Sequence, residues 1–217
     1  MPSIFSLWGN FMRIALAAAL LVASTQLFAQ SGYGQGDPLY EPAYVPVPAT
    51  PDQVVRRGVD RLTGFLMGAQ NPSPASIRVF LDREIAPDFD FTYMARWAAG
   101  PMYRRLSPAQ HARMASVLKD MFLSALAKNL GTYAQPTPRV DVYPARASAN
   151  GSQATVHARV VSPNGMYSGL NFRFYWNEQG WRIFDVSANG ASAVAYYRSY
   201  FGEMFRRHGP DAVLQQQ

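Results

Sequence analysis

Residues that could do chemistry are few in this chain of 217 residues, and they lie far apart. The chain contains no cysteine, and its three histidines, His111, His157 and His208, have no histidine or cysteine at metal-ligand spacing. Zinc-type sites and thiol nucleophiles need such residues in defined patterns. A glycine-rich phosphate loop is also missing from the sequence. We therefore expect no metal, no cofactor and no cysteine nucleophile.

The acidic residues offer one candidate for acid–base catalysis. Asp88 and Asp90 flank Phe89, so their side chains would point the same way in an extended segment. Asp82 and Glu84, two residues apart on a predicted helix, diverge. An isomerase-like enzyme acting on an apolar ligand could use Asp88 or Asp90 as its base. Asp90 also stands where it can cap the following helix, so a structural role competes with the catalytic one.

Apolar side chains are the more unusual feature, at 48% of the chain. Two predicted strands carry apolar faces, and a predicted long helix adds a stripe with two methionines. Buried aromatic residues usually form a solid core, whereas methionine-rich helix faces suit adaptable apolar sites. A scaffold with a solid core and a protein with an apolar cavity both stay open. The residues concerned are Val156, Ala158, Val160, Leu170, Phe172, Phe174 and Trp176 on the strands, and Met114, Leu118, Met121, Phe122, Ala125 and Leu126 on the helix.

The first residues indicate export. Arg13 precedes the apolar run of residues 14–23, and a segment ending at Ala29 follows, which is the pattern of a cleaved secretory signal peptide over residues 1–29. Without residues 1–29 the chain keeps 19 cations against 14 acids, a net charge of +5. Residues 30–50 are rich in glycine and proline and predict a flexible linker. One compact domain over residues 51–217 follows. In an exported protein with dispersed cations we expect no nucleic-acid partner.

Helices are predicted over most of residues 51–132. Thr50–Gln53 and Ser107–Gln110 have the capping-box pattern with proline at the first helical position. Ser73 opens another helix in the same way, and Asp90 can cap a short helix over residues 91–99. A last helix is predicted over residues 190–208.

After Gly131 the apolar period changes from helical to alternating, which predicts strands near residues 138–147, 153–162, 167–176 and 181–187. Asn-Gly pairs at residues 150–151 and 164–165 predict hairpin turns, so residues 133–189 should form an antiparallel meander. In the last strand, Ile183 would share one face with Trp181, and Phe184 would share the other with Val186. Helices, then a meander, then one helix make an α+β pattern.

Several motifs, in one order, resemble the MlaC family of periplasmic phospholipid carriers, also called toluene-tolerance proteins. The resemblance covers about residues 53–214. It rests on Phe89-Asp90-Phe91-x-x-Met94-Ala95-Arg96, Gly100 with an arginine pair, Ser107-Pro108-Ala109-Gln110, Phe122, Leu130-Gly131-x-Tyr133, Trp181-x-Ile183-x-Asp185-Val186, Asn189-Gly190-x-Ser192 and Tyr197-Arg198-x-x-Phe201.

The resemblance implies a twisted antiparallel sheet of four strands or slightly more, cystatin-like or nuclear-transport-factor-like, curled around helices. It implies a periplasmic carrier without enzymatic activity that shuttles phospholipid between membranes. Its partners would be an outer-membrane lipoprotein complex and an inner-membrane ABC transporter with a ring-shaped lipid-binding subunit. On this interpretation the acyl chains contact Leu118, Met121, Phe122, Leu126, Val142, Val156, Val160, Leu170, Phe172 and Phe174. The headgroup meets Arg96, Arg104, Arg105 or Arg198 at the mouth.

Overall fold

The helices begin at the residues that the capping signals predict. The computed structural model describes residues 48–69, 72–130, 139–162 and 165–215. The Gln53 side chain accepts a hydrogen bond from the Thr50 N–H at 3.0 Å, and the Asp90 carboxylate accepts one from the Tyr93 N–H at 2.8 Å. The helices are α2 (Pro51–Gly68), α3 (Pro74–Phe80), α4 (Phe91–Ala99), α5 (Pro108–Leu130) and α6 (Ala193–Gln215).

Three short helical segments connect these helices: η1 (Leu81–Ile85), η2 (Ala86–Asp88) and η3 (Gly100–Arg105). The first part of the C-terminal helix ends near residue 208, as expected. A break follows at Gly209, whose φ of 78° is left-handed, and Pro210 comes directly after it. A second helical part then continues to Gln215. The expected signal peptide, residues 1–29, and residues 30–47 of the expected linker lie outside the described residues.

The sheet is antiparallel and has six strands, in the order β1-β3-β4-β5-β6 with β2 also paired to β3. The strands are β1 (Arg139–Val142), β2 (Arg146–Ala147), β3 (Gln153–Val161), β4 (Tyr167–Asn177), β5 (Gly180–Ala188) and β6 (Ala191–Ser192). The first predicted strand is divided in two around Pro144, which has no N–H to donate to a ladder. Left-handed Asn189 and Gly190 form the tight turn that adds β6.

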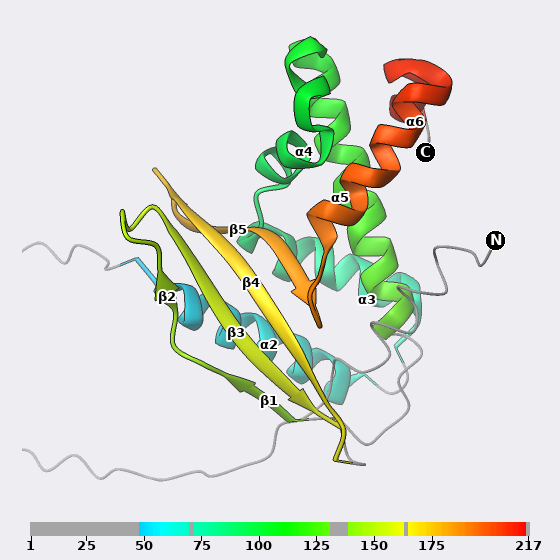
Figure 1. Cartoon of the computed structure of the whole chain (residues 1–217). Helices are drawn as coiled ribbons and strands as arrows, with labels where there is room; N and C mark the ends of the chain where they lie inside the picture. The colour runs from blue at the N-terminus through cyan, green and yellow to red at the C-terminus, as the bar shows by residue number, and fades with distance from the viewer. Residues whose placement is uncertain (1–47, 70–71, 131–138, 163–164, 216–217) are drawn as a thin grey trace, which may run out of the picture.

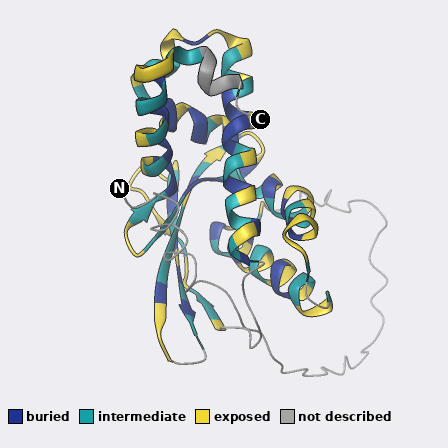
Figure 2. Ribbon diagram, turned by 90° about the vertical axis from the view of Figure 1, so that its right-hand side faces the viewer, coloured by how far each residue is buried: buried dark blue, intermediate teal, exposed yellow. Residues whose placement is uncertain are grey.

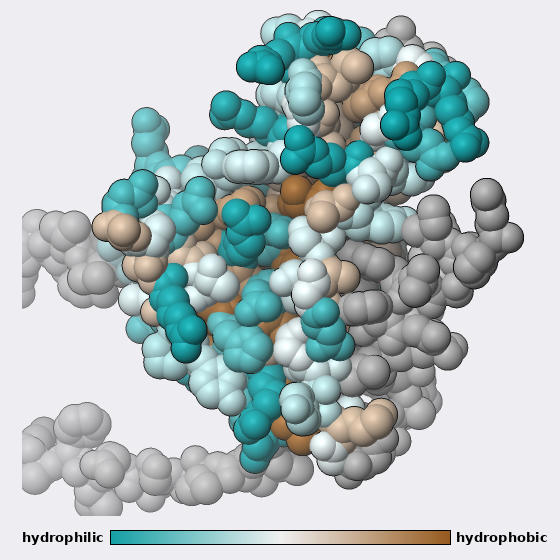
Figure 3. Space-filling model, viewed as in Figure 1, coloured by the Kyte–Doolittle hydropathy of each residue, from teal (hydrophilic) through white to brown (hydrophobic). Residues whose placement is uncertain are grey.

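The helices form two groups around the sheet (Figure 1). Helix α2 crosses behind β3 and β4 in this view, whereas α4, α5 and α6 pack together beyond the β5 side. Figure 2 shows that buried residues follow the inner sides of the helices and alternate along the strands. On β3, Ala154, Val156, Ala158 and Val160 are buried, and the residues between them are not. The outer face of the sheet carries mostly hydrophilic side chains, with apolar residues visible between them (Figure 3).

A bulge in β5 changes the expected side-chain directions. Arg173 pairs with Asp185 and Phe174 pairs with Ile183, so Phe184 is an extra residue in the ladder. Ile183 and Val186 therefore face the same side of the sheet, which corrects the strict alternation predicted for this strand. Phe184 points to the other side, where its ring lies 5.3 Å from that of Tyr93 on α4.

Asp185, next to the bulge, ties the sheet to the start of α6. Its carboxylate accepts hydrogen bonds from the Val194 N–H at 3.0 Å and the Ser192 hydroxyl at 2.8 Å, and Arg173 lies 3.6 Å away. The side chain is buried, so these partners replace the water it loses.

We expect Asp185→Ala to lower the free energy of unfolding by about 3 kcal/mol, because it leaves a buried helix terminus without its acceptor. Urea unfolding measures the change. Asp120→Ala is the matched control, since the Asp120 carboxylate is 64% exposed in its pair with Arg78 and such pairs contribute less than about 1 kcal/mol. Equal losses in the two variants would contradict the role of Asp185.

Candidate functional site

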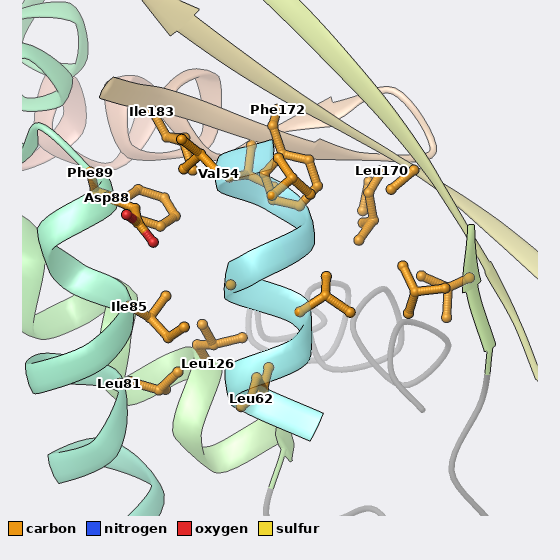
Figure 4. A pocket seen from close by; sticks show the side chains of 18 of the residues that line it. Val54, Leu62, Leu81, Ile85, Asp88, Phe89, Leu126, Leu170, Phe172 and Ile183 are labelled. Atoms are coloured by element: carbon orange, nitrogen blue, oxygen red, sulfur yellow. The ribbon is translucent and has the colours of Figure 1, made fainter. Parts of the chain in front are cut away.

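An apolar pocket lies between the inner face of the sheet, α2, η1 and α5. Figure 4 shows Leu170, Phe172 and Ile183 from the sheet facing Leu81, Ile85 and Leu126 from the helices, with α2 between them. The empty space is about 1180 Å³, part of it open to solvent. Its described lining is Val54, Val55, Gly58, Val59, Leu62, Leu81, Ile85, Asp88, Phe89, Phe122, Leu126, Val140, Ala158, Val160, Leu170, Phe172, Ile183, Val186, Ala188 and Ala191. Every one of these side chains except that of Asp88 is hydrocarbon or hydrogen.

Short side chains keep this space open where α2 passes the sheet. At its first turn, Val54 and Val55 pack in a solid cluster with Val156, Phe174 and Ile183. One turn later α2 presents Gly58, which has no side chain. A Cβ there would lie 4.0 Å from Asp88 Oδ2 and 4.0 Å from Ile85 Cδ1, so the helix leaves room without strain. Opposite α2, the sheet contributes alanines at positions 158 and 188.

Five of the ten residues predicted to contact acyl chains line the pocket: Phe122, Leu126, Val160, Leu170 and Phe172. The other five lie outside its described lining. Val156 and Phe174 belong to the solid cluster under Val54 and Val55, and Val142 packs against it. Leu118 is fully buried in the core that joins α4, α5 and α6, and Met121 packs against that core. The inner face of the sheet is thus part pocket and part solid core, which alternation alone does not distinguish.

The four arginines predicted to meet the headgroup lie on helical segments. Arg96 is on α4, Arg104 and Arg105 are on η3, and Arg198 is on α6, and all four are exposed and outside the described lining. The Arg198 guanidinium covers Gly100, where a Cβ would come within 3.0 Å of Nη2. Gly100 has a left-handed φ of 56°, so both its conformation and this neighbour favour glycine.

The one ionisable side chain of the described lining, Asp88, pairs with an arginine of α2. Arg61 Nη2 lies 2.5 Å from Asp88 Oδ2. Burial raises the pKa of the Asp88 carboxyl above that of an ordinary aspartate, and Arg61 opposes this rise. Arg57 and Arg182 also act on this carboxylate and lower its pKa.

Asp88 and Asp90 do not share a partner. Asp90 caps α4 and also accepts a hydrogen bond from the Tyr175 hydroxyl, a contact that raises the pKa of Tyr175 to about 12 together with the larger effect of burial. Asp90 lies outside the described lining. Asp88 ends η2, and the chain is extended at Phe89 and Asp90, where Phe89 pairs with Ile183.

The histidines have separate surroundings. His111 stacks on Tyr103 with ring centres 3.8 Å apart, whereas His157 lies 3.0 Å from the side-chain oxygen of Asn171. Within residues 48–69, 72–130, 139–162 and 165–215, no group of three histidine or acidic residues is arranged to hold a metal ion. In the same part of the chain, no helix combines the length and the apolar character needed to cross a bilayer.

A family model described as MlaC protein matches residues 60–216 of this sequence. The chain belongs to the MlaC family. A solved structure, the phospholipid-binding protein from Ralstonia solanacearum in complex with a phospholipid, superposes with a TM-score of 0.68 at 22% identity over 77% of this chain and 94% of that one. The two proteins therefore share their α+β fold. No curated protein matches the chain.

The MlaC match begins inside α2, so four lining residues precede it: Val54, Val55, Gly58 and Val59. In the sequence, Val55, Val59 and Leu62 follow one another at helical spacing, but this pattern alone does not assign their face to a site. A usable signal was present, because Gly58 interrupts this apolar face one turn from Val54 and Leu62. A glycine at such a position marks either a close approach or an unfilled space.

We expect Asp88→Asn to raise the free energy of unfolding at pH 7. Because burial raises the pKa of Asp88 in the folded protein, its ionisation favours the unfolded state as the pH rises through that pKa. The isosteric amide cannot ionise. The two proteins should therefore differ at pH 7 and converge near about pH 3, where an unfolded aspartate is also protonated. Urea unfolding at both pH values measures the difference. A variant less stable than the native protein at pH 7 would show that the Arg61 pair outweighs burial.

Proposed function

We propose that this protein is a phospholipid carrier that holds acyl chains in the pocket between α2 and the sheet. The observation that carries this proposal is the described lining, in which Asp88 is the one ionisable group among twenty residues. Membership of the MlaC family supports it, and so does the phospholipid complex of the solved Ralstonia protein with the same fold.

Burial of hydrocarbon supplies the driving force for such binding. An acyl chain in water costs about 0.8 kcal/mol per methylene, so two chains of about 16 carbons represent roughly 25 kcal/mol. An apolar cavity replaces the membrane as solvent for these chains, and it does not leave buried polar groups without partners.

The setting of this activity is also a proposal. A cleaved signal peptide over residues 1–29 would export the chain, residues 30–50 would link it, and residues 51–217 would form the lipid-binding domain in the periplasm. As the soluble component of an ABC-type lipid transport system, it would exchange phospholipid with an outer-membrane lipoprotein complex and with an inner-membrane transporter that has a ring-shaped lipid-binding subunit.

The two rival hypotheses find less support. An isomerase needs polar groups that hold its substrate beside the base, and the described lining has Asp88 alone, already paired with Arg61. A scaffold needs no empty space, whereas an unfilled cavity lowers the free energy of unfolding. The pocket is therefore better explained by a ligand.

The direct test is to purify the protein after export from cells, extract it with organic solvent and identify co-purified lipids by mass spectrometry. We expect diacyl phospholipid at a fixed ratio to protein, and uptake of phospholipid from vesicles by the delipidated protein. The absence of both would overturn the proposal.

We expect Gly58→Leu to weaken phospholipid binding about thirtyfold. The leucine would occupy space now left for about two to three ligand methylenes, worth about 2 kcal/mol. Its Cβ meets only ordinary contacts at 4.0 Å, and leucine is the better helix former, so the variant should fold.

Gly64→Leu is the matched control for this experiment. Gly64 lies in the same helix and is exposed, and a Cβ added to it would have no atom within 4 Å. The control should gain the same helix propensity and bind phospholipid as the native protein does. Equal affinity of the two variants in vesicle uptake would place the ligand elsewhere.

A further inference from the structure

The charged groups near the pocket gather on one side of it. Asp88 is the ionisable residue of the described lining, and Arg61 lies against it at 2.5 Å. Arg57 and Arg182 act on the same carboxylate. These four residues come from α2, η2 and β5, so segments far apart in the sequence bring their charges together. The rest of the described lining is apolar.

Water reaches this charged side. The Asp88 side chain is 23% exposed and that of Arg61 is 39% exposed. A ligand with one polar end can therefore keep that end hydrated here while its hydrocarbon extends along Phe172, Leu170 and Val160. The opposite orientation would bring the polar end against Val140 and Val160, where the described lining offers no hydrogen-bonding side chain.

The balance of charge suits a phosphate. Arg61 contacts the Asp88 carboxylate, and the charges of Arg57 and Arg182 also act on it, so cations are in excess even with Asp88 ionised. A guanidinium presents its N–H groups as a planar fork that matches the oxygens of a phosphate. Arg61 is the member already seated beside the lining, where Gly58 one turn earlier leaves space above Asp88.

We propose that the Arg61–Asp88 pair is the headgroup site, in which Arg61 binds the lipid phosphate and Asp88 accepts hydrogen bonds from a primary ammonium group. This inference rests on the proposed function and names its preferred ligand, a zwitterionic aminophospholipid. Without lipid, Asp88 takes the place of the phosphate and holds Arg61 at the pocket.

The preference for an aminophospholipid follows because the lipid phosphate would replace Asp88 as the partner of Arg61. A phosphate that takes Arg61 removes the closest cation from a partly buried carboxylate, and a buried charge that loses its partner is costly. A headgroup with its own ammonium returns a cation to Asp88, so both charges stay paired. A lipid whose headgroup adds only a glycerol, such as phosphatidylglycerol, leaves Asp88 without that replacement. A quaternary ammonium has no N–H to donate, so it pairs less well than a primary one.

The test is competition between headgroups in vesicle uptake. Delipidated protein is incubated with phosphatidylcholine vesicles that contain equal amounts of phosphatidylethanolamine and phosphatidylglycerol with the same acyl chains, and mass spectrometry gives the ratio of the two bound lipids. We expect the native protein to take phosphatidylethanolamine over phosphatidylglycerol by about tenfold. Asp88→Asn should bring that ratio close to one while total uptake continues.

Arg61→Gln should lower the uptake of both lipids about tenfold, because both carry a phosphate. Arg61→Lys keeps the charge without the planar fork, so its lipid uptake should fall between those of the native protein and Arg61→Gln. This intermediate uptake would separate loss of phosphate recognition from loss of folding. Asp120→Asn and Arg83→Gln are matched controls on exposed ion pairs outside the described lining, and both should behave as the native protein. Inorganic phosphate added without lipid headgroups should not compete.

Three results would overturn the headgroup site while phospholipid uptake still supports the carrier: equal uptake of the two lipids by the native protein, an unchanged ratio in Asp88→Asn, or competition by inorganic phosphate. Native protein that takes up no lipid from any vesicle would overturn the carrier and the headgroup site together.

Discussion

The pocket depends on one contact, the packing of the first turn of α2 on the sheet. Val54 and Val55 are buried against Val156, Phe174 and Ile183, and burying such side chains is worth about 1.5–3 kcal/mol each. This contact fixes the height of α2 above the sheet at one end. One turn further along α2, Gly58 presents no side chain, and the pocket opens beside it. The solid cluster and the empty space are consequences of the same geometry.

Strand β5 connects this pocket to the helical core. Its bulge turns Ile183 and Val186 toward α2 and sends Phe184 toward Tyr93 on α4. Without the extra residue, Val186 would point away from the pocket, and Asp185 would not lie where it accepts from the start of α6. One irregularity of the ladder thus lets a single strand line a cavity on one face and anchor two helices on the other.

Local signals predicted the elements well because they act over a few residues. Capping residues such as Asp90 and Ser107 and the alternation of β3 need no knowledge of the rest of the fold. The pocket, in contrast, depends on contacts between distant segments. Val156 and Val160 have the same residue type, strand and face, yet one packs under Val54 and the other lines empty space. Which of the two happens depends on where α2 crosses, and this is set by tertiary contacts between segments far apart in the sequence.

Asp88, like the pocket beside it, lowers the stability of the fold. A pocket built only for stability would be filled, and its rim would hold no carboxylate with a pKa raised by burial. The unfilled pocket and the partly buried Asp88 carboxylate both lower the stability of the empty protein. If the protein carries lipid as proposed, a bound lipid would restore the missing contacts and stabilise the folded state in proportion to the logarithm of its concentration relative to its dissociation constant. On that proposal the empty form is the less stable one, which would favour release of lipid only to an acceptor that supplies an equally apolar environment.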